Sequence, residues 1–310
     1  MKILVTGGSG FIGSHIVEQL EKEKKNEIII FDIAKPEVVH SSNVSYFDGD
    51  ISFKTSVDRA IKGCEEVYDC AGVLGTHELV FQTERAIDTN IKGCFNVIQS
   101  SLENNVKRIF HPTKPFFKNY WENTYTISKI SAENFVRMYR NVYNMDITIL
   151  RWMNATGARQ HLYPVRKFIP IIIMQALLNK DIEIYGTGEQ TVDIIDVRDI
   201  ANIAIQTTRS GISVGSNEVY DVGSGEAISC NDVAEYIITK INSKSKIKHI
   251  PMRLGEALDT KIVAKTHSEL FSKIKYKPQY SFDETIEECI NYTKSLSPSF
   301  LKKSYEFFYK

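Results

Sequence analysis

The feature that most constrains this chain is its first thirteen residues, MKILVTGGSGFIG. A short apolar run of β-forming residues, Lys2 to Thr6, is followed by Gly7, Gly10 and Gly13 at three-residue intervals. Apolar residues at helical spacing come next. A strand, a glycine turn and a helix in that order are typical of a dinucleotide-binding unit, although a glycine triplet alone could be a purely structural turn. Such glycines let backbone N–H groups approach a pyrophosphate, beside the positive end of the helix dipole.

An acidic residue follows the second predicted strand, at the distance that suits a bound adenosine ribose. Glu27 to Phe31 is the strand, and Asp32 lies about twenty residues beyond the glycines. A carboxylate there can accept hydrogen bonds from the ribose diol, and its charge would repel a 2′-phosphate. NAD is therefore favoured over NADP, although Lys35 nearby leaves NADP open. The alternative role for Asp32 is that of a turn residue after a strand.

The remaining pattern predicts an α/β fold with a doubly wound parallel sheet of the Rossmann type. Strands are expected at 44–47, 67–70, 108–111 and 147–151, with helices at about 78–104 and 123–143. Such alternation implies right-handed crossovers between parallel strands. In the second half we expect strands at 192–195 and 218–222 and helices at 168–178, 197–208, 230–241, 266–273 and 282–295.

This pattern divides the chain into an NAD-binding Rossmann domain over residues 1–152 and a smaller, mainly substrate-binding lobe over 153–310. Segments near 190–217 are expected to return to the first domain.

Composition argues against several classes of partner. Lys plus Arg and Asp plus Glu both total 38, so neither nucleic acid nor a membrane surface is an expected partner. The longest apolar stretch, 168–178, is too short to cross a bilayer. The first strand starts at residue 2, which predicts no signal peptide. Five scattered cysteines without a CxxC pair fit reduced thiols in the cytoplasm and predict no metal site.

Three side chains predict hydride transfer at an alcohol carbon. Tyr125 and Lys129 stand in YTISK near the start of a predicted helix, and their four-residue spacing places both on one face. An ammonium beside a phenol lowers the pKa of the phenol, which is about 10 in a free tyrosine. Thr113 lies just past the fifth strand, at the sheet edge where ligands bind, and its hydroxyl could hold a substrate hydroxyl. In isolation, Tyr-x-x-x-Lys is usually only a helix surface.

The chain resembles the extended short-chain dehydrogenases/reductases of the NAD-dependent nucleotide-sugar epimerase/dehydratase kind, and UDP-glucose 4-epimerases in particular. The resemblance covers nearly the whole length. The matching stretches are TGGSGFIG at 6–13, GDI at 49–51, CAG at 70–72, TNIKGCFNV at 89–97, YTISK at 125–129, LRWMNATG at 150–157, YGTGEQTVDIIDVRD at 185–199, YDVGSGEAIS at 220–229 and PMRLGEALDT at 251–260.

The resemblance implies a set of NAD-binding residues. They are Gly7, Gly10, Phe11, Ile12, Gly13, Asp32, Asp50, Ile51, Ala71, Gly72, Asn90, Tyr125 and Lys129. In this set the glycines would contact the pyrophosphate, and Asp32 would contact the adenosine ribose. Asp50 and Ile51 would contact the adenine. Ala71 and Gly72 pass beside the phosphates, and Asn90 helps to position the active-site helix. Tyr125 is implied as the base, and Lys129 as the holder of the nicotinamide ribose.

The resemblance also implies a nucleotide-sugar substrate, a UDP-sugar above all. Asn154 and Arg253 would contact its diphosphate. The plainer alternatives are caps or turns for Asn90 and Asn154 and a surface cation for Arg253. A homodimer is expected because relatives pair the helices near 78–104 and 123–143. A place in the synthesis of cell-envelope polysaccharide precursors is likewise implied by resemblance only.

Two departures lie next to Thr113. Only eleven residues separate it from Tyr125, and the short loop at 116–124 is rich in aromatic residues, so it either walls the sugar or packs on the core. Lys114 and Pro115 stand where sugar 4,6-dehydratases carry an Asp-Glu pair that moves a proton at C5 and expels the C6 hydroxyl. Ordinary 4,6-dehydration is therefore disfavoured, unless the loop folds inward and Glu122 takes over that role.

A third departure concerns the substrate diphosphate. Val192 sits where relatives usually carry an arginine, whose planar fork suits phosphate. Arg166, Lys167 and Arg198 are the candidates to compensate for it.

The leading hypothesis is an NAD-dependent nucleotide-sugar 4-epimerase that acts through a transient 4-keto sugar. A 4-dehydrogenase, a ketoreductase or an atypical dehydratase on the same scaffold is the enzymatic alternative. A non-catalytic dinucleotide sensor is the alternative of another class, and the presence of both Tyr125 and Lys129 argues against it.

Overall fold

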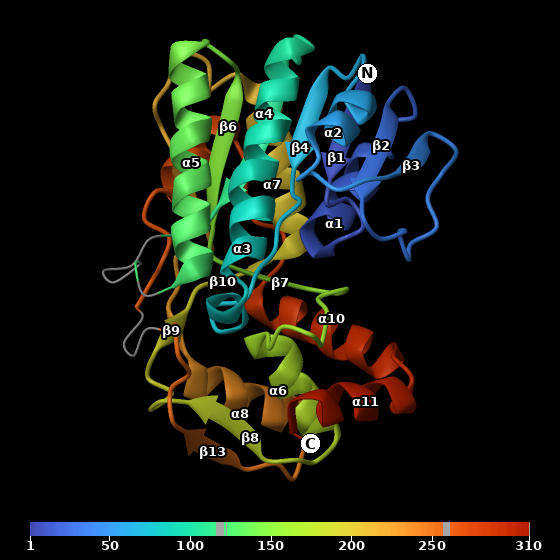
Figure 1. The fold of residues 1–310 in the computed structure, drawn as a ribbon. Helices are drawn as coiled ribbons and strands as arrows, with labels where there is room; N and C mark the ends of the chain where they lie inside the picture. The colour runs from blue at the N-terminus through green and yellow to red at the C-terminus, as the bar shows by residue number, and fades with distance from the viewer. Residues whose placement is uncertain (116–120, 122, 257–260, 310) are drawn as a thin grey trace.

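The structure is a computed structural model that describes residues 1–115, 121, 123–256 and 261–309. Seven parallel strands form the central sheet in the order β11-β6-β5-β4-β1-β2-β3 (Figure 1). Their bounds are β1 Lys2–Thr6, β2 Glu27–Asp32, β3 Val44–Asp48, β4 Glu66–Asp69, β5 Arg108–Thr113, β6 Ile147–Trp152 and β11 Tyr220–Val222. The predicted doubly wound fold is confirmed. The strand order reverses between β1 and β4, and ligands bind at such a switch point.

Helices cover both faces of this sheet, because the buried strands are apolar on both sides. On one face lie α1 (Phe11–Leu20), α7 (Val197–Ser210) and α9 (His267–Ile274). On the other lie α2 (Lys54–Ala60), α4 (Cys94–Glu103) and α5 (Thr124–Val142). Each layer has its own apolar core against the sheet, and together these cores hold the strand ends in place.

A smaller layer lies below the carboxyl ends of the strands (Figure 1). It contains α6 (Phe168–Leu177), α8 (Cys230–Ile241), α10 (Phe282–Ser295) and α11 (Pro298–Tyr309) around the strand pair β8 (Ile182–Tyr185) and β13 (Ile247–Ile250). Most of its core is formed by isoleucine, valine and alanine from α6, α8 and α10. No helix in the described ranges is long and apolar enough to cross a membrane.

The single long helix predicted at 78–104 is wrong. The segment is a 3-10 helix, Glu78–Phe81, then α3 (Thr83–Ala86), a π-helical segment, Ile87–Gly93, and only then α4. Gln82 leaves helical geometry at φ −134° and ψ 45°, which ends the first piece. The π-helical segment holds Asn90, whose side chain hydrogen-bonds to Val73 and to Ser128 in α5. Apolar periodicity cannot reveal such a tertiary constraint.

The strand predicted at 192–195 is two strands in different pairings. β9 (Thr191–Val192) is antiparallel to β12 (Ile228–Ser229), and β10 (Ile194–Asp196) is parallel to β7 (Asn154–Thr156). Asp193 separates them, because its buried carboxylate accepts hydrogen bonds from the backbone N–H groups of Ser224 and Ala264. The sequence prediction also missed β7, β8 and β13, which are short strands outside the central sheet.

Candidate active site

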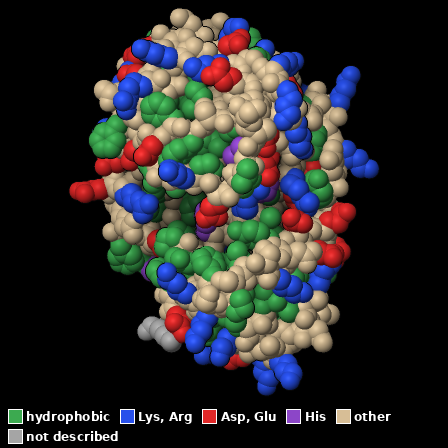
Figure 2. All heavy atoms as spheres, turned by 90° about the vertical axis from the view of Figure 1, so that its right-hand side faces the viewer, with side chains coloured by type: hydrophobic (Ala, Val, Ile, Leu, Met, Phe, Trp, Pro, Cys, Tyr) green, Lys and Arg blue, Asp and Glu red, His purple; other side chains and the backbone are tan. Residues whose placement is uncertain are grey.

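A cavity of about 1110 Å³ lies where the strands of the central sheet end. Its wall contains segments that follow β1 to β6 and, opposite them, residues near α6 and β9. One face of the molecule is hollowed between its upper and lower parts, and hydrophobic side chains line the hollow (Figure 2). The position matches the rule that open α/β sheets bind ligands beyond their carboxyl edge.

The glycine loop forms one end of this cavity, and its shape requires glycine. Gly7 has φ +65°, and a Cβ there would lie 2.7 Å from the backbone N of Ala71. A Cβ on Gly13 would lie 2.1 Å from the carbonyl oxygen of Gly7. The first turn of α1 carries no acidic side chain, so its unpaired N–H groups and dipole are available to an anion. These features fit the pyrophosphate of a dinucleotide.

Asp32 has the turn role considered for it, and its contact with the ribose stays a prediction. Its Oδ1 accepts a hydrogen bond from the N–H of Ala34 at 3.1 Å, and its Oδ2 one from the N–H of Ser9 at 3.0 Å. The turn thus orients the carboxylate, which also lines the cavity and keeps lone pairs for a ribose diol. Asp50, Ile51, Ala71 and Gly72 also line the cavity, as do Gly10, Phe11 and Ile12.

Thr113 ends β5 and carries a buried hydroxyl. Within the described ranges, its Oγ1 makes no hydrogen bond, although the side chain is almost fully buried. Thr113 and Tyr125 both line the cavity. A buried hydroxyl without a partner costs free energy, and a substrate hydroxyl placed beside it would recover that cost.

Tyr125 is placed by the first turn of α5. The N-cap residue Asn123 accepts a hydrogen bond from the N–H of Thr126 at 2.8 Å and donates one to the carbonyl of Gly255 at 2.6 Å. Asn123 is fully buried, so both ends of its amide are used to position the helix start. Burial raises the pKa of Tyr125 to about 12.

Thr113 and Tyr125 line the cavity, whereas Lys129 lies behind the cavity wall. Its Nζ donates a hydrogen bond to the carbonyl of Pro112 at 2.7 Å. Burial lowers the pKa of Lys129, and the nearby groups of Cys94 and Asp69 partly offset the effect. The expected fall in the pKa of Tyr125 is wrong for this structure, because burial of the phenol raises this pKa.

Lys114 stands next to these groups. Its Nζ donates a hydrogen bond to the hydroxyl of Thr126 at 2.8 Å and lies 5.5 Å from the centroid of the Tyr125 ring. The side chain lines the cavity, and burial lowers its pKa to about 8. In the sequence, Lys114 was notable only because dehydratases carry an acidic residue at this position. In the structure, its ammonium lies near the ring of Tyr125, the predicted base.

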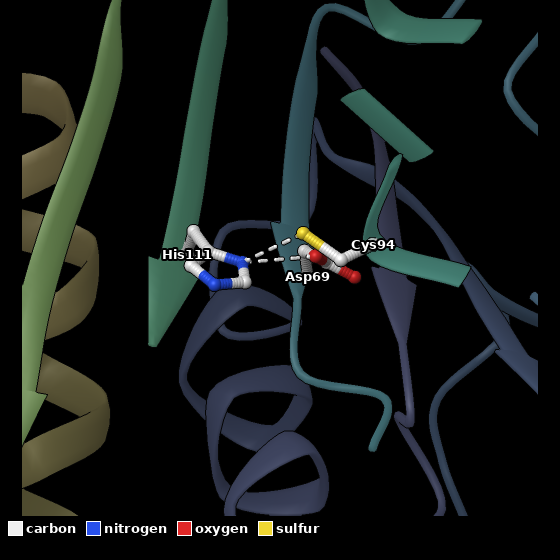
Figure 3. A group of neighbouring side chains, drawn as sticks. All are labelled: Asp69, Cys94 and His111. Atoms are coloured by element: carbon white, nitrogen blue, oxygen red, sulfur yellow. Dashed lines mark hydrogen bonds and ion pairs between the residues drawn. The ribbon is translucent and has the colours of Figure 1, made fainter. Parts of the chain in front are cut away.

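A buried polar group lies beneath the site. Asp69, Cys94 and His111 point toward one another from β4, α4 and β5 (Figure 3). His111 Nδ1 lies 3.0 Å from an Asp69 carboxylate oxygen and 3.7 Å from the sulfur of Cys94. The other oxygen of Asp69 accepts a hydrogen bond from Thr6. We interpret the group as a hydrogen-bonded network that helps Lys129 to stay charged; the absence of a metal site stays a prediction.

The predicted substrate residues separate into two groups. Asn154 lines the cavity, and its Oδ1 accepts a hydrogen bond from the N–H of Asp193. Arg253 does not appear in the wall formed by described residues; it pairs with Glu78 and Glu256 and stacks over the ring of Tyr185. Among the predicted cofactor residues, Asn90 and Lys129 are likewise set behind the wall.

Val192 lines the cavity, and one of its three proposed substitutes does so as well. Arg198 makes a two-pronged ion pair with Asp196, and Arg166 pairs with Glu183. Lys167 lines the cavity at the N-cap of α6, and burial lowers its pKa to about 8.

Sequence reasoning missed much of the wall opposite the sheet. These residues include Glu84, Arg85, Asp88, Gln160, Tyr163 and Gln190. Apart from Gln190, which lies in the matched stretch 185–199, they belong to no motif, and the tertiary fold brings them together. The aromatic loop at 116–124, with Glu122, lies mostly outside the described residues.

The fold and this site define an NAD-binding enzyme with a tyrosine beside its substrate cavity. The sequence profile of the NAD dependent epimerase/dehydratase family matches residues 3–223, and the chain belongs to this family. Family membership confirms the prediction of NAD as cofactor.

Individual relatives agree with this assignment. The low-salt glycan biosynthesis protein Agl12 of Haloferax volcanii is 26% identical, over 94% of this chain and 98% of that protein. A putative UDP-glucose 4-epimerase of Methanocaldococcus jannaschii is 27% identical, with the same shares covered. The fold is shared with the UDP-glucose 4-epimerase of Thermus thermophilus in complex with NAD, at a TM-score of 0.84, 22% identity, and 96% and 100% of the two chains covered.

Proposed function

We propose that this protein is an NAD-dependent nucleotide-sugar 4-epimerase, with a UDP-sugar as substrate. The observation that carries the proposal is the buried hydroxyl of Thr113, which has no hydrogen-bond partner among the described residues and lines the same cavity as Tyr125 and the glycine loop. A secondary alcohol of the substrate would complete this polar pair. Lys114 and Pro115 leave no acid and base at the adjacent positions, so elimination of water is not supported there.

The chain's own residues would handle the proton at the C4 oxygen. Thr113 would hold the C4 hydroxyl by a hydrogen bond, and the phenolate of Tyr125 would take its proton. NAD, held by the glycine loop and Asp32, would supply the hydride acceptor for C4 and later the hydride donor to the 4-keto sugar. Lys129 would stabilise the phenolate against the effect of burial. Tyr125 would then give the proton back, so the reaction has no net redox change.

The substrate diphosphate would lie toward the smaller lobe. Relatives usually carry an arginine for the diphosphate at the position of Val192. We infer that Lys167 supplies this positive charge here, because Lys167 lines the cavity. Arg166 and Arg198 are instead paired with carboxylates. Asn154 would donate from the same wall. Arg253 would reach the diphosphate by exchanging one of its carboxylate partners for phosphate.

Product analysis tests the proposal directly. The purified protein with NAD is incubated separately with UDP-glucose, UDP-galactose, their N-acetyl forms and UDP-glucuronate, and the products are resolved. C4-inverted product with no accumulation of NADH is expected. Failure to invert any of these sugars would refute the epimerase.

Two alternatives have distinct readouts. Steady growth of NADH absorbance would indicate a 4-dehydrogenase, and loss of water by mass spectrometry an atypical dehydratase. A Tyr125→Phe variant separates an enzyme from a dinucleotide sensor, since it should bind NAD but lose turnover. The cytoplasmic location and the polysaccharide pathway remain predictions.

A homodimer forms part of the proposal. α5 carries an apolar stripe of Phe135, Met138 and Val142, all exposed in the isolated chain. α4 lies beside it (Figure 1), and Phe95 of α4 packs edge-on against Phe135 at 6.3 Å between ring centroids. Pairing two such faces would bury the stripe in a four-helix bundle.

A further inference from the structure

Glu78 is a carboxylate from the first half of the chain that faces cations of the smaller lobe. Its Oε1 accepts a hydrogen bond from the backbone N–H of Arg166 at 3.1 Å and lies 3.5 Å from the guanidinium of Arg253. Its Oε2 is buried and has no hydrogen-bond partner among the described residues. Burial lowers the pKa of Lys167 to about 8, and the Glu78 carboxylate partly offsets that effect, which places the two charges near each other. Glu78 is thus an anionic neighbour of both cations proposed to bind the substrate diphosphate.

We propose that Glu78 is an internal competitor of the substrate diphosphate, which must displace this carboxylate from Arg253 before the arginine can bind phosphate. The proposal rests on the proposed function, which assigns Arg253 and Lys167 to the diphosphate of a UDP-sugar. Glu78 would set how tightly the protein holds any ligand that carries the diphosphate. It would do so without contacting the sugar or the reacting groups.

Glu78 makes the longer of the two contacts between Arg253 and carboxylates of described residues. Charge-assisted hydrogen bonds from nitrogen to a carboxylate oxygen are usually about 2.7–2.9 Å long. The 3.5 Å between Arg253 and Glu78 exceeds this range. Glu256 also pairs with Arg253, from three residues further along the chain, and it accepts a second hydrogen bond from the hydroxyl of Thr76 at 2.8 Å. An arriving phosphate would therefore displace Glu78 and leave Glu256 in place.

Charge balance is the physical reason for this exchange. The positive charges of Arg253 and Lys167 are already accompanied by the carboxylates of Glu78 and Glu256. A diphosphate brings further negative charge, so a carboxylate that stays beside the same cations repels it. Water and salt screen this repulsion only partly, because the side chain of Glu78 is 22% exposed. Removal of the Glu78 charge should favour the diphosphate both by freeing Arg253 and by ending the repulsion.

Glu78→Gln removes the charge and keeps the backbone contact. The amide oxygen can still accept the hydrogen bond from the N–H of Arg166, and the side chain keeps its size. Glu183 provides a matched control, because its side chain is 24% exposed and it pairs with the guanidinium of Arg166 rather than with Arg253. Glu183→Gln therefore removes an equal charge nearby without freeing Arg253.

Calorimetric titration of the NAD-loaded protein with UDP and with uridine tests the proposal without requiring turnover. UDP should bind Glu78→Gln at least about fivefold more tightly than the wild type, as expected for the loss of one competing ion pair. Uridine lacks the diphosphate, so its affinity should be the same for both proteins. Glu78→Ala should show the same gain for UDP, since it also lacks the charge. Glu183→Gln should bind UDP like the wild type.

Unchanged or weaker binding of UDP by Glu78→Gln would overturn the proposal, and so would an equal gain for uridine or in Glu183→Gln. Glu78→Ala decides in the same way if Glu78→Gln does not fold. Product analysis separates this proposal from the function on which it rests. A gain for UDP in Glu78→Gln without C4 inversion by the wild type would contradict the epimerase alone. C4 inversion by the wild type without that gain would contradict the role of Glu78 alone.

Discussion

The proposed base is a residue whose surroundings oppose its function. Burial raises the pKa of Tyr125 to about 12, so the phenol keeps its proton at neutral pH. Lys129 is close enough in sequence to help, but its ammonium is bound to the carbonyl of Pro112. The Asp69 carboxylate beneath helps to keep that ammonium charged. Catalysis therefore requires nearby positive charge that lowers the pKa of Tyr125 by more than burial raises it.

Replacement of Lys129 tests this balance. Lys129→Met should lower turnover at pH 7 by about a hundredfold or more, the usual range for proton transfer by a positioned group. The rising limb of the plot of kcat against pH should move to higher pH, because the phenolate loses its nearby cation. Initial rates from pH 6 to 10 provide the measurement. Lys62→Met, which changes an exposed lysine far from the site, is the control; an unmoved pH limb in Lys129→Met would exclude the proposed role.

A second residue prediction concerns stability. His15 in α1 is almost fully buried, and burial lowers its pKa from 6.5 to about 4. The folded protein keeps His15 neutral, whereas the unfolded chain protonates it below pH 6.5. The contribution of His15 to the free energy of unfolding is therefore fully present above pH 6.5 and is lost as the pH falls toward 4. The loss amounts to about 3 kcal/mol at most.

Urea unfolding at pH 7 and pH 4.5 measures the effect. His15→Gln should lose less stability than the wild type over this interval, by about 2 kcal/mol. His161→Gln, at an exposed histidine, should behave like the wild type. Identical pH dependence in wild type and His15→Gln would show that His15 is not the group responsible.

At the scale of secondary-structure elements, the glycine loop and the proposed base both lie at the start of a helix. α1 begins at the glycine loop, and α5 begins at Asn123 and presents Tyr125 in its first turn. Asn123 also ties this turn to Gly255, a residue of the second half of the chain. The position of the base therefore depends on one buried amide.

Asn123→Ala should destabilise the protein by about 1 kcal/mol, the usual cost of a lost N-cap. It should also lower kcat several-fold while leaving the NAD content unchanged, because only the first turn of α5 is loosened. Ser229→Ala is the matched control, since Ser229 caps α8 in the same way, away from the reacting groups. Equal loss of kcat in the two variants would point to general destabilisation instead.

At the scale of the whole molecule, the sheet brings segments that are far apart in sequence to one edge. The apolar stripe on α5 lies away from that edge, and Val142 within it is 67% exposed. An association through this face would leave the cavity open.

Light scattering tests the association. The wild-type protein should have the mass of a dimer, and the double variant Phe135→Glu with Val142→Glu that of a monomer, because two buried charges on each side would oppose contact. Val39→Glu, at a residue 96% exposed elsewhere, should remain dimeric. A wild-type protein with monomer mass would refute the dimer.

Much of the fold was predictable, and the errors have a physical cause. Six strands of the central sheet follow from alternating apolar runs, which are local; the seventh, β11, was expected as a strand of the second half and joins this sheet only through its pairing with β6. The helix predicted at 78–104 is broken at Gln82 and becomes π-helical around Asn90, which bonds to α5 and to Val73. The strand predicted at 192–195 is split at Asp193 by its buried contacts. Periodicity reports which residues are apolar; it does not report which polar side chain must reach another element.

The sequence by itself determined the cofactor loop, the parallel sheet and the tyrosine–lysine pair, because each depends on residues close together in the chain. Only the tertiary structure decided which charges face the substrate. Arg253, Arg166 and Arg198 are each paired with carboxylates, and the cavity wall formed by the described residues contains Lys114 and Lys167. The physical reason is that pairing and burial of a charge depend on neighbours from other elements, which no local pattern specifies.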